Sequence, residues 1–372
     1  MNQDHPRFPE PARQASAVAA AGRVIDANLN RADEATRVIE DTLRFVVEDR
    51  GLHQRCKRIR HEIGDLTARL AGFRLITTRN AAADTGHHSN VASEYSRDGW
   101  PQIIKANFSR LRQSLRTIEE YAKLVDPDLA RQAEQIRYSG YDLERNCATL
   151  LNARQRLRGV ALCVLVDGCD SADEFAACVG DLVHGGAGML QLRDKQLSDR
   201  TLWERAGQLV EILRPTDVLA VINDRPDLAV AVGADGVHIG QDDLPLAATR
   251  KLCGGQMLVG VSTHHVDQVI RAVNEGADYL GVGPVFPSST KSFETFPGTE
   301  LLQQVAGQTA LPAFAIGGIT RDNLDQVVKS GFCRVAVSAA VRDSDLPIAA
   351  ATRQLANYPG LTGGGDCRES SV

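Results

Sequence analysis

The chain has 372 residues, of which 43% are hydrophobic, so it is longer than one typical domain and can bury a real core. Its formal net charge of −5 and its isoelectric point near 6.0 argue against a general nucleic-acid binder. No run approaches the roughly 18 apolar residues of a membrane span, and residues 1–14 have no apolar core of a secretory signal.

Residues 15–150 predict an all-helical domain of unknown role that is built from a duplicated helical hairpin. Apolar residues recur at helical spacing from residue 20 to 70 and again from 103 to 150, with Arg, Glu and Asp between them. The polar residues Asn28, Arg31, Arg37 and Glu40 each recur 79 positions later (107 − 28) as Asn107, Arg110, Arg116 and Glu119. A duplicated hairpin favours a four-helix bundle with a pseudo-twofold axis.

Two hypotheses account for these repeated polar residues. We expect Arg37 and Arg116 to face inward in paired hydrogen-bond networks, because an unpaired buried charge costs several kcal/mol, on the order of 3–5. The alternative is that the repeated residues line a ligand pocket.

The segments that flank the hairpins show weaker signals. Residues 77–100 predict a long loop, and its His87-His88 pair lacks a third metal ligand at a fixed spacing. Residues 1–14 and 363–372 predict disordered tails. The eight cysteines form no C-x-x-C pair, which favours reduced thiols in a cytoplasmic protein.

Residues 159–358 predict a (β/α)₈ TIM barrel. Short β-rich apolar runs alternate there with amphipathic helical stretches, as in a parallel barrel. The predicted strands are Val160–Val166, Gly188–Leu192, Val218–Ile222, Gly236–Ile239, Met257–Val261, Tyr279–Val282, Ala313–Ile316 and Arg334–Val337.

Polar side chains gather at the ends of these predicted strands, which meet at the chemically active mouth of such a barrel. Gln191, Arg193 and Lys195 alternate with two leucines and an Asp, so they share one face and suit an anion with several oxygens. Asp224 and Asp243 follow adjacent strands, and two carboxylates beside two cations suit a Mg²⁺–pyrophosphate group. Taken alone, the first cluster is equally typical of a solvated edge strand, and Asn223-Asp224 is equally typical of a turn or a helix N-cap.

A second phosphate site is predicted where strands 7 and 8 end. Gly317-Gly318 offers backbone N–H groups before an expected helix start, and Ser338 follows strand 8. His238 lies inside strand 4, where we expect a structural histidine with satisfied hydrogen bonds. His264-His265 reads as a helix cap region.

Seven motifs in order resemble the thiamine-phosphate synthase family, which joins hydroxymethylpyrimidine pyrophosphate to thiazole phosphate. The resemblance covers roughly residues 160–350. The motifs are Gln191-Leu-Arg-Asp-Lys195, Asn223-Asp224, Gly236-Val-His-Ile-Gly-Gln-Asp-Asp243, Gly260-Val-Ser262, Gly281-Val-Gly-Pro-Val-Phe-Pro287, Thr290-Lys291 and Gly317-Gly-Ile-Thr320. The helical half is similar to an extension on some family members, and no reaction is assigned to it.

The resemblance implies a role for each group of residues. Asp224 and Asp243 would bind Mg²⁺, and the thiazole phosphate would lie against Gly317, Gly318, Val337 and Ser338. The remaining substrate contacts would come from Gln191, Arg193, Lys195, Asn223, Ser262, Thr290 and Lys291. Of these, Arg193, Lys195, Ser262 and Lys291 would assist departure of pyrophosphate from a carbocation-like pyrimidine. The implied partners are these two small molecules, with no membrane or nucleic acid, and a homo-oligomer is possible.

Two other functions remain open at this point. A tautomerase-like relative would isomerise one phosphorylated thiazole and would need no pyrophosphate site, which the polar set at strands 2 to 4 argues against. A non-catalytic binding or regulatory protein would use the helical half as an interaction module, but would have no use for the paired carboxylates.

Overall fold

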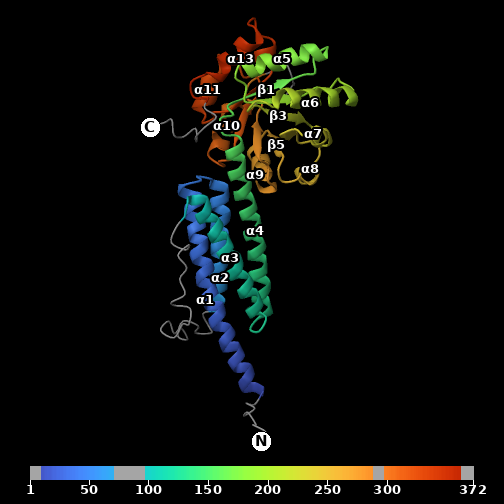
Figure 1. Ribbon diagram of the computed structural model, residues 1–372. Helices are drawn as coiled ribbons and strands as arrows, with labels where there is room; N and C mark the ends of the chain where they lie inside the picture. The colour runs from blue at the N-terminus through green and yellow to red at the C-terminus, as the bar shows by residue number, and fades with distance from the viewer. Residues whose placement is uncertain (1–9, 71–96, 288–296, 362–372) are drawn as a thin grey trace. The chain divides into compact units, whose positions relative to one another are not determined.

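The computed structural model describes residues 10–70, 97–287 and 297–361, which form two compact units, 1–147 and 148–372 (Figure 1). The tail at 363–372, the His87-His88 pair and the motif Thr290-Lys291 lie outside the described residues. The first helix begins at Glu10, so part of the predicted N-terminal tail is helical. Among the described helices, none combines the length and the apolar character that crossing a membrane requires.

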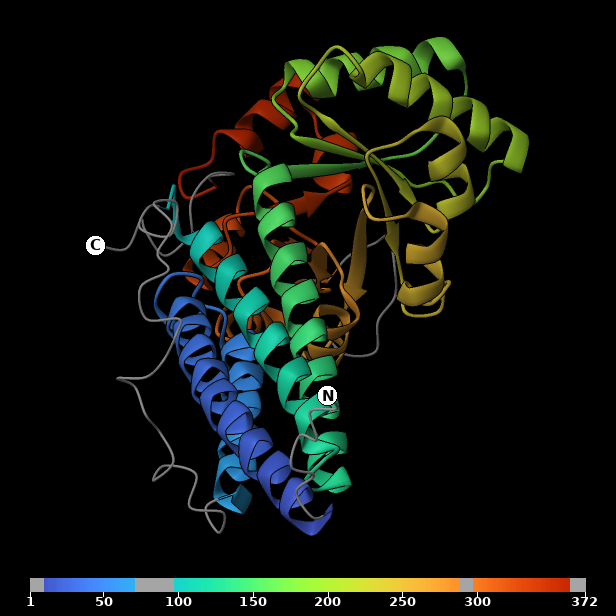
Figure 2. The same cartoon turned by 60° about the horizontal axis from the view of Figure 1, so that its bottom comes forward.

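The first unit is the predicted helical domain. It consists of α1 (Glu10–Phe45), α2 (Arg50–Leu70), α3 (Trp100–Ala122) and most of α4 (Pro127–Arg156). Helices α1 and α3 lie along each other in both views (Figures 1 and 2). Their buried stripes are related by the duplication: Ile25, Leu29 and Ile39 correspond to Ile104, Phe108 and Ile118. The prediction of an all-helical domain built from a repeated hairpin is confirmed.

Charged pairs inside the bundle are also duplicated, although the arginines differ from those predicted. Glu119 accepts a hydrogen bond from Arg137 at 2.9 Å, and the two side chains are 7% and 9% exposed. The equivalent Glu40 pairs with Arg60 at 2.6 Å. Each of these arginines comes from the second helix of its hairpin, so the pairs tie the two helices together.

The expectation that Arg37 and Arg116 face inward is wrong. Their side chains are 65% and 56% exposed and pair with carboxylates of their own helices. Arg37 lies two residues before the buried Ile39, which is about 200° around the helix, and therefore points away from the core.

We predict that Arg137→Ala lowers the free energy of unfolding of the helical unit by about 1.5–3 kcal/mol, because it removes the buried charged hydrogen bond to Glu119 and leaves that carboxylate with only the exposed Arg116. The matched change Arg37→Ala removes an exposed pair and should cost less than about 0.5 kcal/mol. Urea unfolding of the full chain, followed by circular dichroism, measures both. Equal losses in the two variants would contradict the assignment of the buried pair.

The second unit is a closed barrel of eight parallel strands in sequence order, β1 to β8, which confirms the predicted fold class. All eight predicted runs form strands. The strands are β1 (Leu162–Val166), β2 (Met189–Leu192), β3 (Leu219–Asn223), β4 (Gly236–Ile239), β5 (Leu258–Thr263), β6 (Tyr279–Val282), β7 (Ala313–Ile316) and β8 (Val335–Val337). The helices around them are α5 (Ala172–His184), α6 (Asp199–Leu213), α7 (Pro226–Val232), α8 (Leu246–Cys253), α9 (Val266–Glu275), α10 (Gly298–Ala306), α11 (Leu324–Lys329), α12 (Ala339–Arg342) and α13 (Ile348–Ala356).

The barrel interior changes from apolar to polar along the strands. Alternate residues point inward, so Met189 and Val221 lie in the apolar core cluster, and the next inward residues are Gln191 and Asn223. The strands therefore place their polar side chains at the carboxyl end, where the mouth opens.

The opposite end of the barrel is closed by the end of α4. Leu157 and Val160 belong to the core cluster, and Arg154 Nε donates to the carbonyl oxygen of Ala310 at 3.1 Å. Arg156 reaches the carbonyl oxygen that precedes β4, at Asp235. Residues 148–158, which precede the predicted barrel boundary at 159, are therefore part of the barrel unit.

Two glycines make room for a pair of rings inside the barrel. A Cβ atom on Gly260 would lie 2.1 Å from Cζ of Tyr279 and 2.5 Å from Nδ1 of His238. A Cβ atom on Gly281 would lie 3.1 Å from Cε1 of His238. The rings of His238 and Tyr279 occupy this space, with centroids 5.5 Å apart.

Candidate active site

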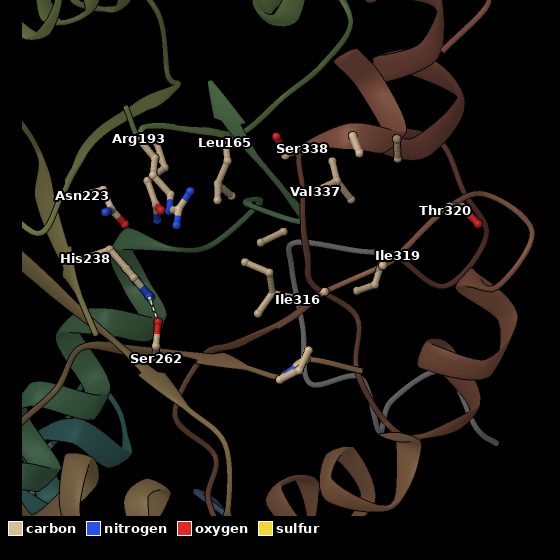
Figure 3. A pocket seen from close by; sticks show the side chains of 18 of the residues that line it. Leu165, Arg193, Asn223, His238, Ser262, Ile316, Ile319, Thr320, Val337 and Ser338 are labelled. Carbon is tan, nitrogen blue, oxygen red and sulfur yellow. Dashed lines mark hydrogen bonds between the residues drawn. The ribbon is translucent and has the colours of Figure 1, made fainter. Parts of the chain in front are cut away.

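A pocket of about 340 Å³ opens at the carboxyl ends of the barrel strands (Figure 3). Eight of the predicted site residues line it. They are Gln191, Arg193, Asn223, Ser262, Gly317, Gly318, Val337 and Ser338. Arg193 and Asn223 lie on one side of the pocket and Val337 and Ser338 on the other (Figure 3). The arrangement suits a ligand that presents different groups to the two sides.

His238 and Ser262 form the polar floor of this pocket. His238 Nε2 lies 2.9 Å from Ser262 Oγ (Figure 3). Its Nδ1 lies 3.3 Å from the hydroxyl of Tyr279. Burial lowers the pKa of the His238 imidazole to about 4, so the ring is neutral near pH 7. The expectation of a satisfied structural histidine is confirmed, and His238 also lines the pocket.

His238 should make the barrel sensitive to acid. Its pKa is about 4 when folded and about 6.5 when unfolded, so between these values the unfolded chain binds the extra proton. The stability contribution of His238 is therefore complete above pH 6.5, and about 3 kcal/mol is lost as the pH falls to 4. We predict that His238→Gln has a flatter profile of unfolding free energy against pH than the unchanged chain. Parallel profiles would show that protonation of His238 is not coupled to folding.

The loop after β2 carries the two predicted cations. Because β2 ends at Leu192, the strand alternation does not extend to Lys195, whose side chain is 60% exposed with Nζ 3.7 Å from Asp224 Oδ2. Asp194 fixes this loop: its carboxylate accepts hydrogen bonds from the backbone N–H groups of Gly168, Gln196 and Leu197. This role of Asp194 could not be predicted, because a lone Asp in a loop carries no distinctive signal in the sequence.

Asp224 and Asp243 come together beside these cations. Burial, a hydrogen bond to Asp243 and repulsion by it raise the pKa of Asp224 to about 6, while Lys195 and Arg193 oppose the shift. Asp243 Oδ2 also accepts a hydrogen bond from the N–H of Gly240 at 2.7 Å. Two carboxylates that repel each other fit a divalent cation between them.

Within the described ranges, no cluster of three or more His, Cys, Asp or Glu side chains is placed to hold a metal ion. A Mg²⁺ ion at Asp224 and Asp243 would therefore take its other ligands from water and from substrate oxygens, as this ion commonly does. The two residues fit the ion, and its binding stays a prediction.

The ends of β7 and β8 form the other side of the pocket. Gly317 and Gly318 have φ values of 100° and 61°, and a Cβ on Gly318 would lie 2.3 Å from the carbonyl oxygen of Pro287. The helix that follows this pair, α11 (Leu324–Lys329), begins six residues after Gly318. The helix that begins at the pocket is α12, after Ser338, and its first turn has N–H groups without intrahelical partners. This is the usual phosphate-binding sector of a TIM barrel.

Several lining residues were missed from the sequence. His264, Thr320 and the apolar Leu165 and Ile316 also face the pocket. His264 had a usable signal, because it directly follows β5, which ends at Thr263, and so lies at the mouth of the barrel. Its Nδ1 lies against the carbonyl oxygen of Gly283, whereas His265 precedes α9.

Two family models match this chain. The model described as thiamine monophosphate synthase matches residues 162–341, and the ThiD2 family model matches residues 23–146. A thiamine-phosphate synthase from Rhodopirellula baltica is 43% identical over 333 residues, which cover 87% of this chain and 88% of that protein. The chain belongs to the thiamine-phosphate synthase family.

Two further relatives match most or about half of the chain. The thiamine-phosphate synthase of Synechocystis is 37% identical over 350 residues, covering 92% of this chain and 97% of that protein. A solved thiamine phosphate pyrophosphorylase from Pyrococcus furiosus has a TM-score of 0.48 and 31% identity, and covers 54% of this chain and 95% of its own. The predicted family and the enzyme activity that the family's name states are confirmed, while the role of each site residue stays a prediction.

Proposed function

We propose that the barrel pocket joins hydroxymethylpyrimidine pyrophosphate to thiazole phosphate and releases pyrophosphate, with Mg²⁺ as cofactor. One observation carries the proposal. A single pocket is bordered on one side by Arg193 beside the Lys195, Asp224 and Asp243 group, and on the other by the β7–β8 phosphate sector. Two phosphorylated substrates can therefore lie in one cavity with their reactive ends facing.

The bond changes follow from this placement. The C–O bond between the pyrimidine methylene and pyrophosphate breaks, and its electron pair leaves with the pyrophosphate oxygen. The thiazole nitrogen then donates its lone pair to the methylene carbon and forms the new C–N bond. Arg193 and Lys195 offset the charge that develops on the departing group, a task that Lys291 would share. Mg²⁺ at Asp224 and Asp243 would supply further neutralisation of that charge.

The floor of the pocket would position the pyrimidine. The hydrogen bond to His238 fixes the hydroxyl of Ser262, and Gln241 Nε2 donates to the carbonyl oxygen of the same serine. The scheme needs no general base, and a histidine whose pKa is about 4 is a weak one near pH 7.

A pyrophosphate-release assay with both substrates and Mg²⁺ tests this function. We expect pyrophosphate and thiamine phosphate in equal amounts, and none when either substrate is omitted. Isomerisation of the thiazole phosphate alone would favour the tautomerase-like alternative, and tight binding without turnover would favour a regulatory protein. The acidic net charge supports small molecules over nucleic acid as partners; cytoplasmic location and homo-oligomer formation stay predictions.

A further inference from the structure

The helical unit has a groove of its own, with a volume of about 640 Å³, between α1 and α3. Its ten lining residues form five pairs related by the duplication, each 79 positions apart (107 − 28). Asn28 corresponds to Asn107, Arg31 to Arg110 and Glu34 to Gln113. The volume lies within the range of small-molecule sites, about 300–1,000 Å³.

The two asparagines are built into the groove in the same way. They are 7% and 5% exposed, and each donates from Nδ2 to a backbone carbonyl one turn earlier, at 2.9 Å and 2.8 Å. These bonds orient the amides and leave the Oδ1 atoms as acceptors. Arg110 donates to Oδ1 of Asn107 at 3.4 Å, whereas no donor among the described residues reaches Oδ1 of Asn28. The amide oxygen of Asn28 is therefore an acceptor that an N–H or O–H group of a bound ligand can use.

The charges in the groove are unbalanced. Arg31 has no hydrogen bond or ion pair within the described part of the chain, and the contact of Arg110 is to a neutral amide. The next repeated arginines, Arg37 and Arg116, are both paired with carboxylates. Glu34 is a carboxylate, but its counterpart in the second repeat is the neutral Gln113. The groove is therefore lined by two guanidinium groups, those of Arg31 and Arg110, and one carboxylate. Exposed guanidinium groups without carboxylate partners are well suited to phosphate oxygens.

We propose that this groove is a second binding site, which takes a small phosphorylated compound. Arg31 and Arg110 hold its phosphoryl group, and Oδ1 of Asn28 accepts a hydrogen bond from an N–H or O–H group of the same compound. The site is separate from the barrel pocket and does not depend on the reaction proposed there.

Calorimetry on the full chain tests the site, with inorganic pyrophosphate as the first probe at physiological salt. All titrations use a chain that carries the double change Arg193→Gln/Lys195→Gln as its background. This change weakens pyrophosphate binding in the barrel pocket, so the binding that remains is due to the groove. On this background we expect one binding event, which Arg31→Gln/Arg110→Gln weakens at least tenfold. The matched control is Arg37→Gln/Arg116→Gln, a repeated arginine pair on the same two helices outside the groove, and it should change the affinity less than twofold.

Two further titrations identify the ligand. Hydroxymethylpyrimidine pyrophosphate and thiazole phosphate are titrated into the same background, and a compound with donor groups should bind more tightly than inorganic pyrophosphate. Asn28→Leu should remove that preference and leave inorganic pyrophosphate binding unchanged.

The proposal fails if the background binds none of the three probes at millimolar concentration, or if the groove and control variants bind alike. Arg31→Gln/Arg110→Gln with an intact barrel should release pyrophosphate at the unchanged kcat. Failure of the groove proposal and failure of the proposed barrel reaction are therefore distinguishable.

Discussion

Replacing either carboxylate of the Asp224–Asp243 pair with its amide should reduce kcat by about 100-fold or more. Asp224→Asn and Asp243→Asn keep the shape of the side chain and remove one of the two charges that would hold Mg²⁺. Because the cation would then be bound by one carboxylate, the remaining activity should need a higher Mg²⁺ concentration for half-saturation. Pyrophosphate release measured against Mg²⁺ concentration gives both quantities.

The control for this experiment is Asp242→Asn, an exposed carboxylate next to Asp243. It changes the net charge by the same amount and should leave both kcat and the Mg²⁺ requirement within about twofold. Near-normal turnover of Asp224→Asn or Asp243→Asn at ordinary Mg²⁺ levels would refute the metal assignment.

The second large effect is expected at Gly318. Alanine there places a Cβ atom 2.3 Å from the carbonyl oxygen of Pro287 and 2.8 Å from that of Phe286, at a φ of 61° that disfavours any side chain. The loop must move to relieve these contacts, which displaces backbone groups at the phosphate sector. We predict that Gly318→Ala raises the KM for thiazole phosphate at least tenfold, with a smaller effect on the KM for the pyrimidine substrate.

Gly207→Ala is the matched control, because Gly207 lies within α6 and a Cβ there has no neighbour within 4 Å. It should leave both KM values unchanged and stabilise the barrel by up to about 1 kcal/mol. If Gly318→Ala raised both KM values equally, the thiazole phosphate would not be bound at this sector.

The barrel could be predicted closely because each of its strands leaves a local signal. Eight apolar runs became eight strands, and the polar residues after them lie at one mouth because parallel strands all end on the same side. The helix that follows Ser338 was not predicted, because α12 spans only Ala339–Arg342 and is too short to show a helical period.

In the helical half, the sequence predicted the elements but not the direction of the individual side chains. Duplication identified the repeated polar residues, but it does not say which way each side chain points. The half-buried and buried partners of Glu40 and Glu119 are Arg60 and Arg137 of the second helix in each hairpin, whereas Arg116, which also pairs with Glu119, is exposed. The boundary between the two units, after Cys147, could not be predicted either, because α4 continues from Pro127 to Arg156 with no break in its helical pattern.

The ring pair inside the barrel constrains how this sequence can change over evolution. Gly260, Gly281, His238 and Tyr279 share one volume. A Cβ atom on Gly260 would overlap the rings of Tyr279 and His238, and one on Gly281 would press on the His238 ring at 3.1 Å. Gly260→Ala should be tolerated only together with a smaller residue at position 279. The four positions are thus expected to be epistatic, so that a substitution at one is accepted only with a compensating substitution at another. The hydrogen bond between Ser262 and His238 is kept only if these substitutions preserve the packing of the histidine ring.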